Sequence, residues 1–185
     1  MATLFVDKVD PQSGTSLEIG SSGDTITIPS GATITNSGTD TGFGGANTPA
    51  FSTRLNSAQN IANNTFVKIT FDGELFDTDS AFASNKFTVP SGEGGNYFFN
   101  YGIQYLAYAA NRGISSFRKN GSEIQTSEIS PLTASTNPTI TGALSLNLSA
   151  GDYVEVFVYQ NSGSAQDIRG SNTELFTYFG GYKLI

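Results

Sequence analysis

The segment from Asn96 to Leu106, Asn-Tyr-Phe-Phe-Asn-Tyr-Gly-Ile-Gln-Tyr-Leu, constrains the fold more than any other part of the chain. Its density of aromatic and β-branched residues favours an extended strand over a helix. In a strand, one face carries Phe98 among small and amide residues. The opposite face is large and apolar throughout and consists of Tyr97, Phe99, Tyr101, Ile103 and Tyr105. Such a strand needs cover from its own core on one face and some cover on the other, from a second sheet or another subunit.

Composition limits the architecture. A chain of 185 residues forms one domain, or one domain with an arm, and 21 Gly residues suit a turn-rich all-β protein. No run of about 18 apolar residues occurs, so we predict no membrane insertion. The first ten residues lack the basic end and apolar core of a secretory signal peptide.

Charge and missing residue types narrow the chemistry. The net charge is −7, and no basic run is longer than Arg118-Lys119, which argues against nucleic acid and anionic membranes as partners. The chain has no Cys and no His, which excludes disulfides, Ser-His-Asp triads, Cys-His dyads and the usual His-ligated metal sites. Chemistry by carboxylates alone, such as glycoside hydrolysis, stays open, but no cleft-forming module is evident. We predict that the protein is not an enzyme.

Residues 1–48 differ from the rest of the chain. They hold one Lys and five acidic residues, and Thr-Ile-Thr recurs at 25–27 and 33–35. Two copies of so short a repeat indicate one or two β-rungs or a β-meander, which cannot bury a core alone. We predict a short β-rich arm that becomes ordered against a partner or its symmetry mates; the alternative is an unstructured tail. The Gly-rich stretch 39–48 is a predicted linker, and Pro49 opens a folded domain of residues 49–185.

The folded domain shows strand patterns separated by turn residues, and no segment has helical periodicity. Asn120-Gly121 is the strongest hairpin signal and predicts a type I′ turn. Residues 57–64 and 160–172 are polar and predicted to be loops, and 74–82 is a polar excursion with apolar anchors. About ten short strands fit a two-sheet sandwich of the jelly-roll type. The predicted strand segments are 50–55, 65–71, 86–90, 96–108, 114–125 (a hairpin), 141–148, 152–159 and 173–185.

An ordered set of motifs in this domain resembles the C1q/tumour-necrosis-factor-like globular domain. The motifs include Ala50-Phe-Ser-Thr-Arg, Lys86-Phe-Thr-Val-Pro, Leu146-Asn-Leu-Ser-Ala-Gly-Asp-Tyr-Val-Glu-Val and Phe179-Gly-Gly-Tyr-Lys-Leu-Ile. The resemblance spans nearly all of residues 50–185 and implies a ten-stranded jelly roll that forms a compact homotrimer. The collagen-like Gly-X-Y stalk of complement members is absent.

The resemblance implies that aromatic residues of this domain build the core and the three-fold interface. An exposed platform for stacking carbohydrate is the alternative. The residues expected at the trimer interface are Tyr97, Phe99, Tyr101, Tyr105, Phe157, Tyr159, Tyr178, Phe179 and Tyr182.

The N-terminal arm has a resemblance of its own. Its segment Val6-Asp-Lys-Val-Asp-Pro-Gln-Ser-Gly-Thr-Ser-Leu-Glu-Ile-Gly-Ser-Ser-Gly-Asp-Thr-Ile-Thr-Ile-Pro-Ser-Gly-Ala is similar to the leader of virion structural proteins of marine tailed phages. The similarity implies that the arm docks on the major capsid protein or another virion protein, and that the domain is displayed at the virion surface. The expected anchoring residues are Leu4, Phe5, Val6, Ile26, Ile28 and Ile34.

Both resemblances together predict a trimeric head fibre or capsid decoration protein, with a host cell-surface glycan as a candidate ligand. One alternative is a tail-fibre tip or receptor-binding protein. Another is a cement protein that clamps shell subunits and has no host ligand.

Two groups of charged residues are candidate sites. The carboxylates of Asp72, Glu74, Asp77 and Asp79 supply oxygen at alternating positions, which can bind calcium, but the loop pattern is incomplete and an acidic loop is usually just solvated. We therefore predict no cofactor, with calcium as the alternative. Four basic residues lie in or beside predicted turns, as solubilising charges or as contacts to anionic sugars or a neighbouring virion protein: Arg112, Arg118, Lys119 and Arg169. The loops expected to cluster at the ends of the sandwich are 91–96, 111–113, 120–122, 130–138 and 160–172.

Overall fold

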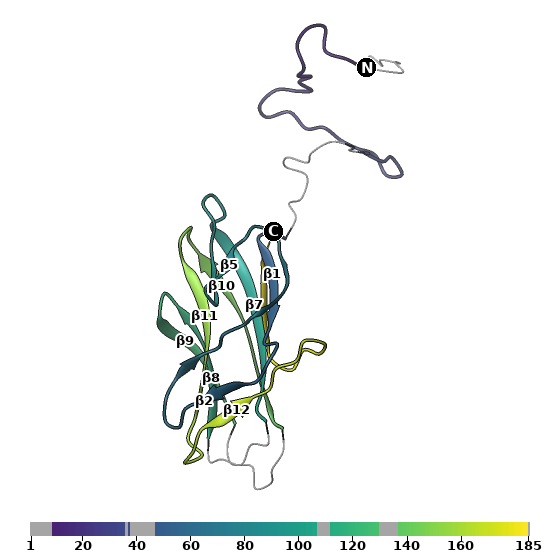
Figure 1. The fold of residues 1–185 in the computed structure, drawn as a ribbon. Helices are drawn as coiled ribbons and strands as arrows, with labels where there is room; N and C mark the ends of the chain where they lie inside the picture. The colour runs from purple at the N-terminus through teal and green to yellow at the C-terminus, as the bar shows by residue number, and fades with distance from the viewer. Residues whose placement is uncertain (1–8, 36, 38–46, 107–111, 130–136, 185) are drawn as a thin grey trace. The chain divides into compact units, whose positions relative to one another are not determined.

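The computed structural model describes residues 9–35, 37, 47–106, 112–129 and 137–184. The chain divides into two compact units, Met1–Asp40 and Thr41–Ile185. All the strands of the described residues belong to the second unit, which we call the knob (Figure 1). Within the described ranges, no helix is long and apolar enough to cross a membrane.

The knob contains thirteen strands in the described residues. They are β1 (Ala50–Arg54), β2 (Gln59–Ile61), β3 (Val67–Lys68), β4 (Gly73–Asp77), β5 (Phe82–Ala83), β6 (Lys86–Thr88), β7 (Gly95–Gln104), β8 (Gly113–Lys119), β9 (Ser122–Ile129), β10 (Thr139–Leu148), β11 (Tyr153–Gln160), β12 (Gln166–Ile168) and β13 (Tyr178–Lys183).

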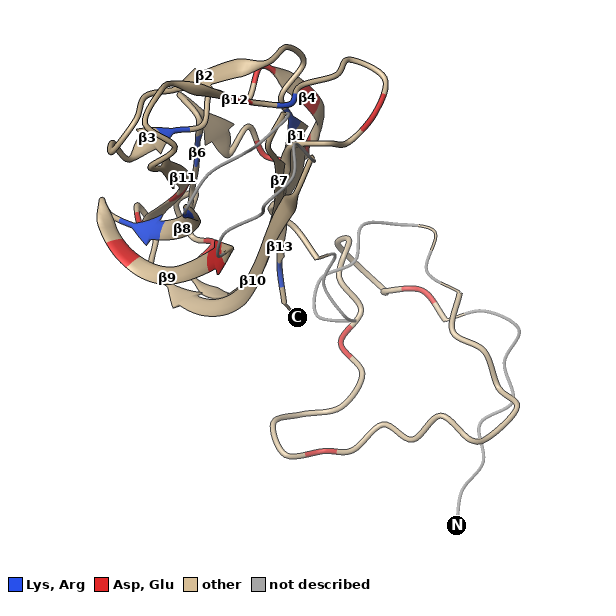
Figure 2. Cartoon of the chain, turned by 90° about the horizontal axis from the view of Figure 1, so that it is seen from below, with Lys and Arg blue, Asp and Glu red and all other residues tan. Residues whose placement is uncertain are grey.

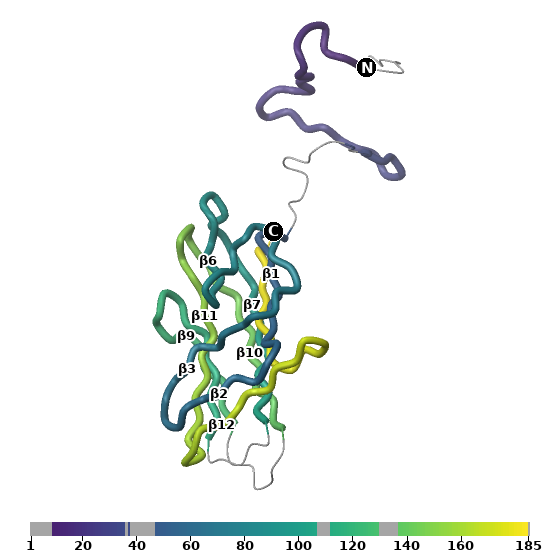
Figure 3. Tube along the Cα trace, viewed as in Figure 1, coloured from purple at the N-terminus to yellow at the C-terminus, as the bar shows by residue number. Residues whose placement is uncertain are grey.

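These strands form two main antiparallel sheets. The first has the order β10-β7-β13-β1-β4, and the second has the order β5-β6-β11-β8-β9 with β3 also paired to β11. A small third sheet joins β2 and β12, which lie side by side in the tube of Figure 3. The all-β, two-sheet prediction is confirmed. The strand count exceeds the expected ten because several strands, β2, β3, β5 and β12 among them, are only two or three residues long.

Strand β7, which contains most of the aromatic segment, is central to the first sheet. It pairs with β10 over its whole length and with β13 on its other edge. Its large apolar face points between the two sheets, where Tyr97, Phe99 and Ile103 are fully buried. The alternation in the sequence therefore predicted correctly which residues share a face.

Aromatic rings from both sheets form the centre of the core. The ring of Phe51 lies 5.0 Å from that of Phe87 and 4.9 Å from that of Phe179, measured between centroids. The ring of Phe99 lies 5.4 Å from that of Phe87. Ring pairs at these separations each add roughly 0.5–1.5 kcal/mol beyond the area that they bury. The knob is therefore held together mainly by contacts between the two sheets.

Two glycines make space for these rings. A Cβ atom at Gly181 would lie 2.4 Å from Cδ1 of Phe99, and one at Gly142 would lie 2.5 Å from Cζ of Tyr101. Any larger residue at these positions would collide with a buried ring that has no room to move. At each of these positions, the ring packs directly on the backbone of the neighbouring strand.

Buried tyrosine hydroxyls in the core are all hydrogen-bonded. The Tyr101 hydroxyl lies 2.8 Å from Oγ of Ser115, and the Tyr105 hydroxyl donates to the backbone oxygen of Tyr159 at 2.8 Å. The Tyr97 hydroxyl donates to the backbone oxygen of Glu93. Burial, with the nearby carboxylate of Glu93, raises the pKa of Tyr97 to about 12. These rings therefore contribute apolar area without leaving a polar group unpaired.

The predicted hairpin turn is confirmed. Asn120 and Gly121 join β8 to β9 with φ values of 52° and 82°, as a type I′ turn requires.

The described part of the arm contains turns and extended backbone. The amide of Asp24 donates to the backbone oxygen of Ser21 at 3.0 Å, and that of Ala32 to Pro29 at 3.1 Å. The Thr-Ile-Thr segments form no strand there, because an extended segment without a neighbouring strand has nothing to pair with. The predicted β-structure of the arm is therefore not formed in residues 9–35. The anchoring candidates Leu4, Phe5 and Val6 lie outside the described residues.

Replacing Phe51 with Ala should destabilise the knob by about 3–5 kcal/mol, because it removes a fully buried ring from the centre of the core. Denaturant unfolding of Phe51→Ala and of the original chain measures the difference in the free energy of unfolding. The control is Ile124→Ala on β9, where the side chain is 40% exposed and the expected change is within about 0.5 kcal/mol. Equal losses in the two variants would contradict the assignment of the core.

Candidate functional site

The structure separates the nine residues expected at a trimer interface. Five of them are buried inside a single chain, and no more than 1% of each is exposed: Tyr97, Phe99, Tyr101, Tyr105 and Phe179. They face the knob's own second sheet, so they are not available to another copy of the chain. The expectation that they lie at the interface is corrected. A period of two shows which residues share a face, but not what covers that face.

The remaining four expected residues lie on two different surfaces. Tyr178 and Tyr182 are on β13 in the first sheet, and Phe157 and Tyr159 are on β11 in the second. Because both pairs point away from the core, they lie on opposite outer faces of the sandwich. One flat interface cannot contain all four.

The outer face of the first sheet is aromatic at its centre, and Arg54 of β1 lies directly opposite Tyr178 on this face. Phe98 and Tyr182 are directly opposite on β7 and β13, with ring centroids 5.6 Å apart. Tyr182 is 37% exposed, and Phe76 on the edge strand β4 is 50% exposed. The Tyr178 ring lies over Gly102, where a Cβ would come within 2.5 Å of it. We call these four aromatic residues, Phe76, Phe98, Tyr178 and Tyr182, the aromatic face.

The outer face of the second sheet combines aromatic rings with charges. The Arg118 guanidinium lies 3.9 Å from the ring centroid of Phe157 and 5.2 Å from that of Phe66. The ring of Phe66 lies 5.0 Å from that of Tyr159. Beside them, Nζ of Lys68 contacts Glu155 at 2.6 Å. Basic residues on β3, β6 and β8 mark this side of the knob in Figure 2.

The two ends of the sandwich differ in their role. The amide of Lys183 donates to the backbone oxygen of Pro49 at 3.0 Å, so the arm enters the knob where β13 ends. The turns at 91–94, 120–121 and 149–152 lie at this attachment end, because they join the strand ends nearest Pro49 and Lys183. The opposite, distal end carries the loop 161–165 and the strand ends near Tyr105 and Arg112.

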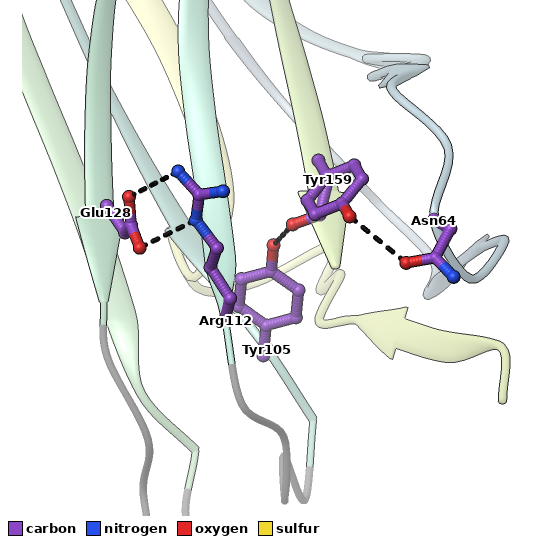
Figure 4. A network of polar contacts seen from close by, with 5 residues as sticks. All are labelled: Asn64, Tyr105, Arg112, Glu128 and Tyr159. Carbon is purple, nitrogen blue, oxygen red and sulfur yellow. Dashed lines mark hydrogen bonds and ion pairs between the residues drawn. The ribbon is translucent and has the colours of Figure 1, made fainter. Parts of the chain in front are cut away.

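Polar contacts organise the distal end, as Figure 4 shows. Arg112 donates to both carboxylate oxygens of Glu128, at 2.7 and 2.8 Å. These hydrogen bonds raise the pKa of Arg112 and lower that of Glu128. The Tyr159 hydroxyl donates to Oδ1 of Asn64 at 3.1 Å, which ties β11 to the loop after β2. Arg112, a predicted basic contact, is therefore held in an ion pair at an exposed surface.

The other basic candidates also have partners in the knob. Lys119 forms an ion pair with Asp152 at 2.9 Å. The Arg169 guanidinium lies 3.5 Å from the ring centroid of Phe176 and donates to Oε1 of Gln104 at 3.1 Å. Each of these charges has a structural contact as well as solvent exposure.

Three of the four acidic candidates are engaged in hydrogen bonds of the fold. Asp77 accepts hydrogen bonds from the amides of Ala81 and Phe82, at 3.0 and 2.8 Å. Asp79 accepts from the Thr78 hydroxyl, and Asp72 accepts from the amide of Asn56 at 2.7 Å. In the part of the chain that the structure describes, no three Asp or Glu residues converge as metal ligands. The calcium alternative therefore has no support from the geometry.

Two facing sheets of antiparallel strands, with a core of rings between them, define a jelly-roll domain. A model of the C1q domain family matches residues 50–184. The chain therefore belongs to the C1q domain family.

Solved structures share the fold at low sequence identity. The globular domain of zebrafish complement 1qA is 18% identical, with a TM-score of 0.55, covering 74% of this chain and 97% of that one. Murine APRIL is 11% identical, with a TM-score of 0.56 and coverage of 73% and 98%. Eiger TNF from S. frugiperda is 14% identical, with a TM-score of 0.55 and coverage of 74% and 92%. No curated protein matches the chain.

Asp152, in the turn before β11, should make the stability of the knob depend on pH in the acid range. Hydrogen bonds from Asn120, the ion pair with Lys119 and the amide of Ser149 lower the pKa of Asp152 from 3.8 to about 2. Because the folded-state pKa is the lower one, this carboxylate stabilises the fold above about pH 4, and the effect is lost as the pH falls toward about 2. Asp152→Asn should therefore lower the melting temperature at pH 7 but not near pH 2.

Glu123→Gln on β9 is the control, since no hydrogen bond to the Glu123 carboxylate is found among the described residues. Its melting temperature should follow that of the original chain across the same pH range. A constant difference between Asp152→Asn and the original chain from pH 7 to pH 2 would refute the assignment.

Proposed function

We propose that this chain is a virion structural protein of a tailed phage: a homotrimeric head fibre or capsid decoration protein. Its arm attaches to the particle, and its C1q-type knob is displayed at the virion surface as a non-enzymatic binding module.

The arm carries this proposal, because large apolar side chains in its described part are exposed. Ile19, Ile26 and Ile34 are 66%, 60% and 55% exposed, and Ile28 is 47% exposed. Short extended segments with such side chains gain a buried environment only from a partner. Residues 9–35 contain three acidic residues and no Lys or Arg, as Figure 2 shows. That charge favours a protein surface over nucleic acid as the partner.

The aromatic face supports self-association of the knob. Exposed aromatic side chains grouped on a sheet face, with an Arg such as Arg54 beside them, are typical of protein interfaces. A single heterologous contact of this kind closes into a ring when the rotation between copies is three-fold. The face on the second sheet, with Arg118 and the pair of Lys68 and Glu155, then remains on the outside of the trimer.

Recognition would occur at the distal end and the outer sides of the trimer. The loops there lie opposite the point where the arm enters, so particle attachment leaves them accessible. Many weak contacts to a host-surface ligand, repeated over three knobs and many spikes, would add up through avidity.

Tyr182→Asp should convert the trimer to a monomer, because it places a charge in the centre of the proposed interface. Phe66→Asp is a matched control: this ring is also 37% exposed, but it lies on the other outer face. Light scattering should give about three chains for Phe66→Asp and one for Tyr182→Asp. Trimers in both variants, or a monomeric original chain, would contradict the assigned interface.

Removing residues 1–48 should abolish binding to particles that lack this protein and leave the knob trimeric. In the full chain, Ile26→Asp with Ile28→Asp should have the same effect, because charges replace the proposed contact residues. Thr25→Asp with Thr27→Asp adds the same charge to the same segment and should still bind. Cosedimentation with particles measures the binding of the truncated chain and of both double variants. Binding of the truncated knob to particles would disprove anchoring by the arm.

The same particles distinguish the alternative roles. If particles that lack this protein adsorb poorly to the host but keep their capsid stability, the protein is a displayed binding module. Loss of capsid stability with normal adsorption supports a cement protein instead.

A further inference from the structure

A β-bulge at the edge of the first sheet places a carboxylate where an apolar residue is expected. The register between β1 and β4 shifts between Ser52 and Thr53, so that Phe76 is opposite Ser52 and Glu74 is opposite Thr53. Leu75 is the extra residue and is 44% exposed. Without the bulge, Leu75 would face Thr53 and Glu74 would point outward. The bulge therefore turns Glu74 toward the inner side of the sheet.

The inner side at this edge is a pocket of about 230 Å³. Its floor is formed by Thr53 and by the rings of Phe71 and Phe82, whose centroids are 6.3 Å apart. Thr53 is 1% exposed, and its hydroxyl donates to the backbone oxygen of Phe179 at 3.0 Å. Glu74 and Asp72 line the pocket from the β4 side. The pocket is thus apolar at its base and carboxylate-lined at one wall.

The opposite wall of the pocket is the turn between β5 and β6. Ser84 and Asn85 form this two-residue turn with φ values of 52° and 59°. The Lys68 ammonium donates to the backbone oxygen of Ser84 at 2.8 Å and also contacts Glu155, which fixes the turn to the second sheet. Both walls are therefore held by hydrogen-bonded backbone, and the pocket is formed before any ligand arrives.

The charges in the pocket are not balanced from within. Among the described residues, none donates a hydrogen bond to the Glu74 carboxylate or forms an ion pair with it. No Lys or Arg lines the pocket. Asp72 accepts a hydrogen bond from the amide of Asn56, and this neutral donor leaves the negative charge of the carboxylate uncompensated. The pocket therefore has a net negative charge over an aromatic floor.

We propose that this pocket binds a monovalent organic cation, an ammonium or guanidinium group on a short hydrocarbon stem. The charged head would pair with Glu74 at the mouth, and the apolar stem would lie against Phe71 and Phe82. The volume is below the 300–1,000 Å³ typical of drug-sized ligands, so the pocket suits one group the size of a Lys or Arg side chain. An inorganic ion would gain nothing from the apolar floor. The site does not depend on the particle-bound role proposed above.

Titration of the ¹⁵N-labelled full chain by NMR tests the proposal with three probes. N-acetyl-arginine amide and n-butylamine carry the cation, whereas N-acetyl-norleucine amide carries only the stem. Both cations should cause saturable shifts at the amides of Glu74, Phe82 and Ser84, and the norleucine probe should not. Tighter binding of the arginine probe would indicate a basic side chain of a partner protein as the natural ligand, and tighter binding of butylamine a free amine.

Glu74→Gln should weaken binding of both cations about fivefold, which corresponds to about 1 kcal/mol. Its melting temperature should stay unchanged, because the carboxylate holds nothing in the fold. Glu123→Gln, which removes an exposed carboxylate on β9, should bind as the original chain does. The proposal is overturned if the cations cause no saturable shift in the original chain, or if Glu74→Gln binds them equally well.

Discussion

Packing of aromatic rings between the two sheets is the interaction on which the rest of the knob depends. Phe51, Phe99 and Phe179 come from three neighbouring strands of one sheet; Phe51 and Phe99 contact Phe87 from the other sheet, and Phe179 packs against Phe51. This packing requires glycine at position 181, because a Cβ atom there would collide with the ring of Phe99. Since these rings are buried inside one chain, they are not available for a contact with another copy of the chain.

That constraint gives the two outer faces their different character. On the first sheet, the aromatic residues that alternate with the core rings are Phe98, Tyr178 and Tyr182, which form a surface suited to burial with Arg54 beside Tyr178. On the second sheet, Arg118 is stacked on Phe157, and Lys68 is paired with Glu155. A stacked guanidinium and an ion pair keep that face compatible with water. The asymmetry between the faces, together with the uncovered apolar residues of the arm, connects the fold to the proposed function.

Much of this fold could be predicted from the sequence, because local patterns determine it. Alternation in β7, β10 and β11 and the Asn120-Gly121 turn are local signals, and the ordered motifs indicated the C1q family. Strands β2 and β12 were missed, since each is polar and exists only because Gln166 pairs with Ile61 far away in the chain.

The candidate sites were harder to predict, because they depend on pairing between distant segments. Which face of β7 lies inside depends on the second sheet, and alternation alone cannot show this. The bulge opposite Thr53 also could not be seen, because a register shift exists only between two strands. It separates Glu74 from Asp77 and Asp79, whose carboxylates serve neighbouring backbone and hydroxyl groups.

We propose that the knob is displayed on a virion as a trimer whose copies meet through the Tyr182 side of the first sheet. Electron cryomicroscopy of intact particles that carry the full chain is the decisive measurement. We expect three-fold spikes with β13 nearest the axis, Arg118 facing solvent and arm density continuous with the capsid. Single knobs, or spikes in which the Arg118 face surrounds the axis, would contradict it.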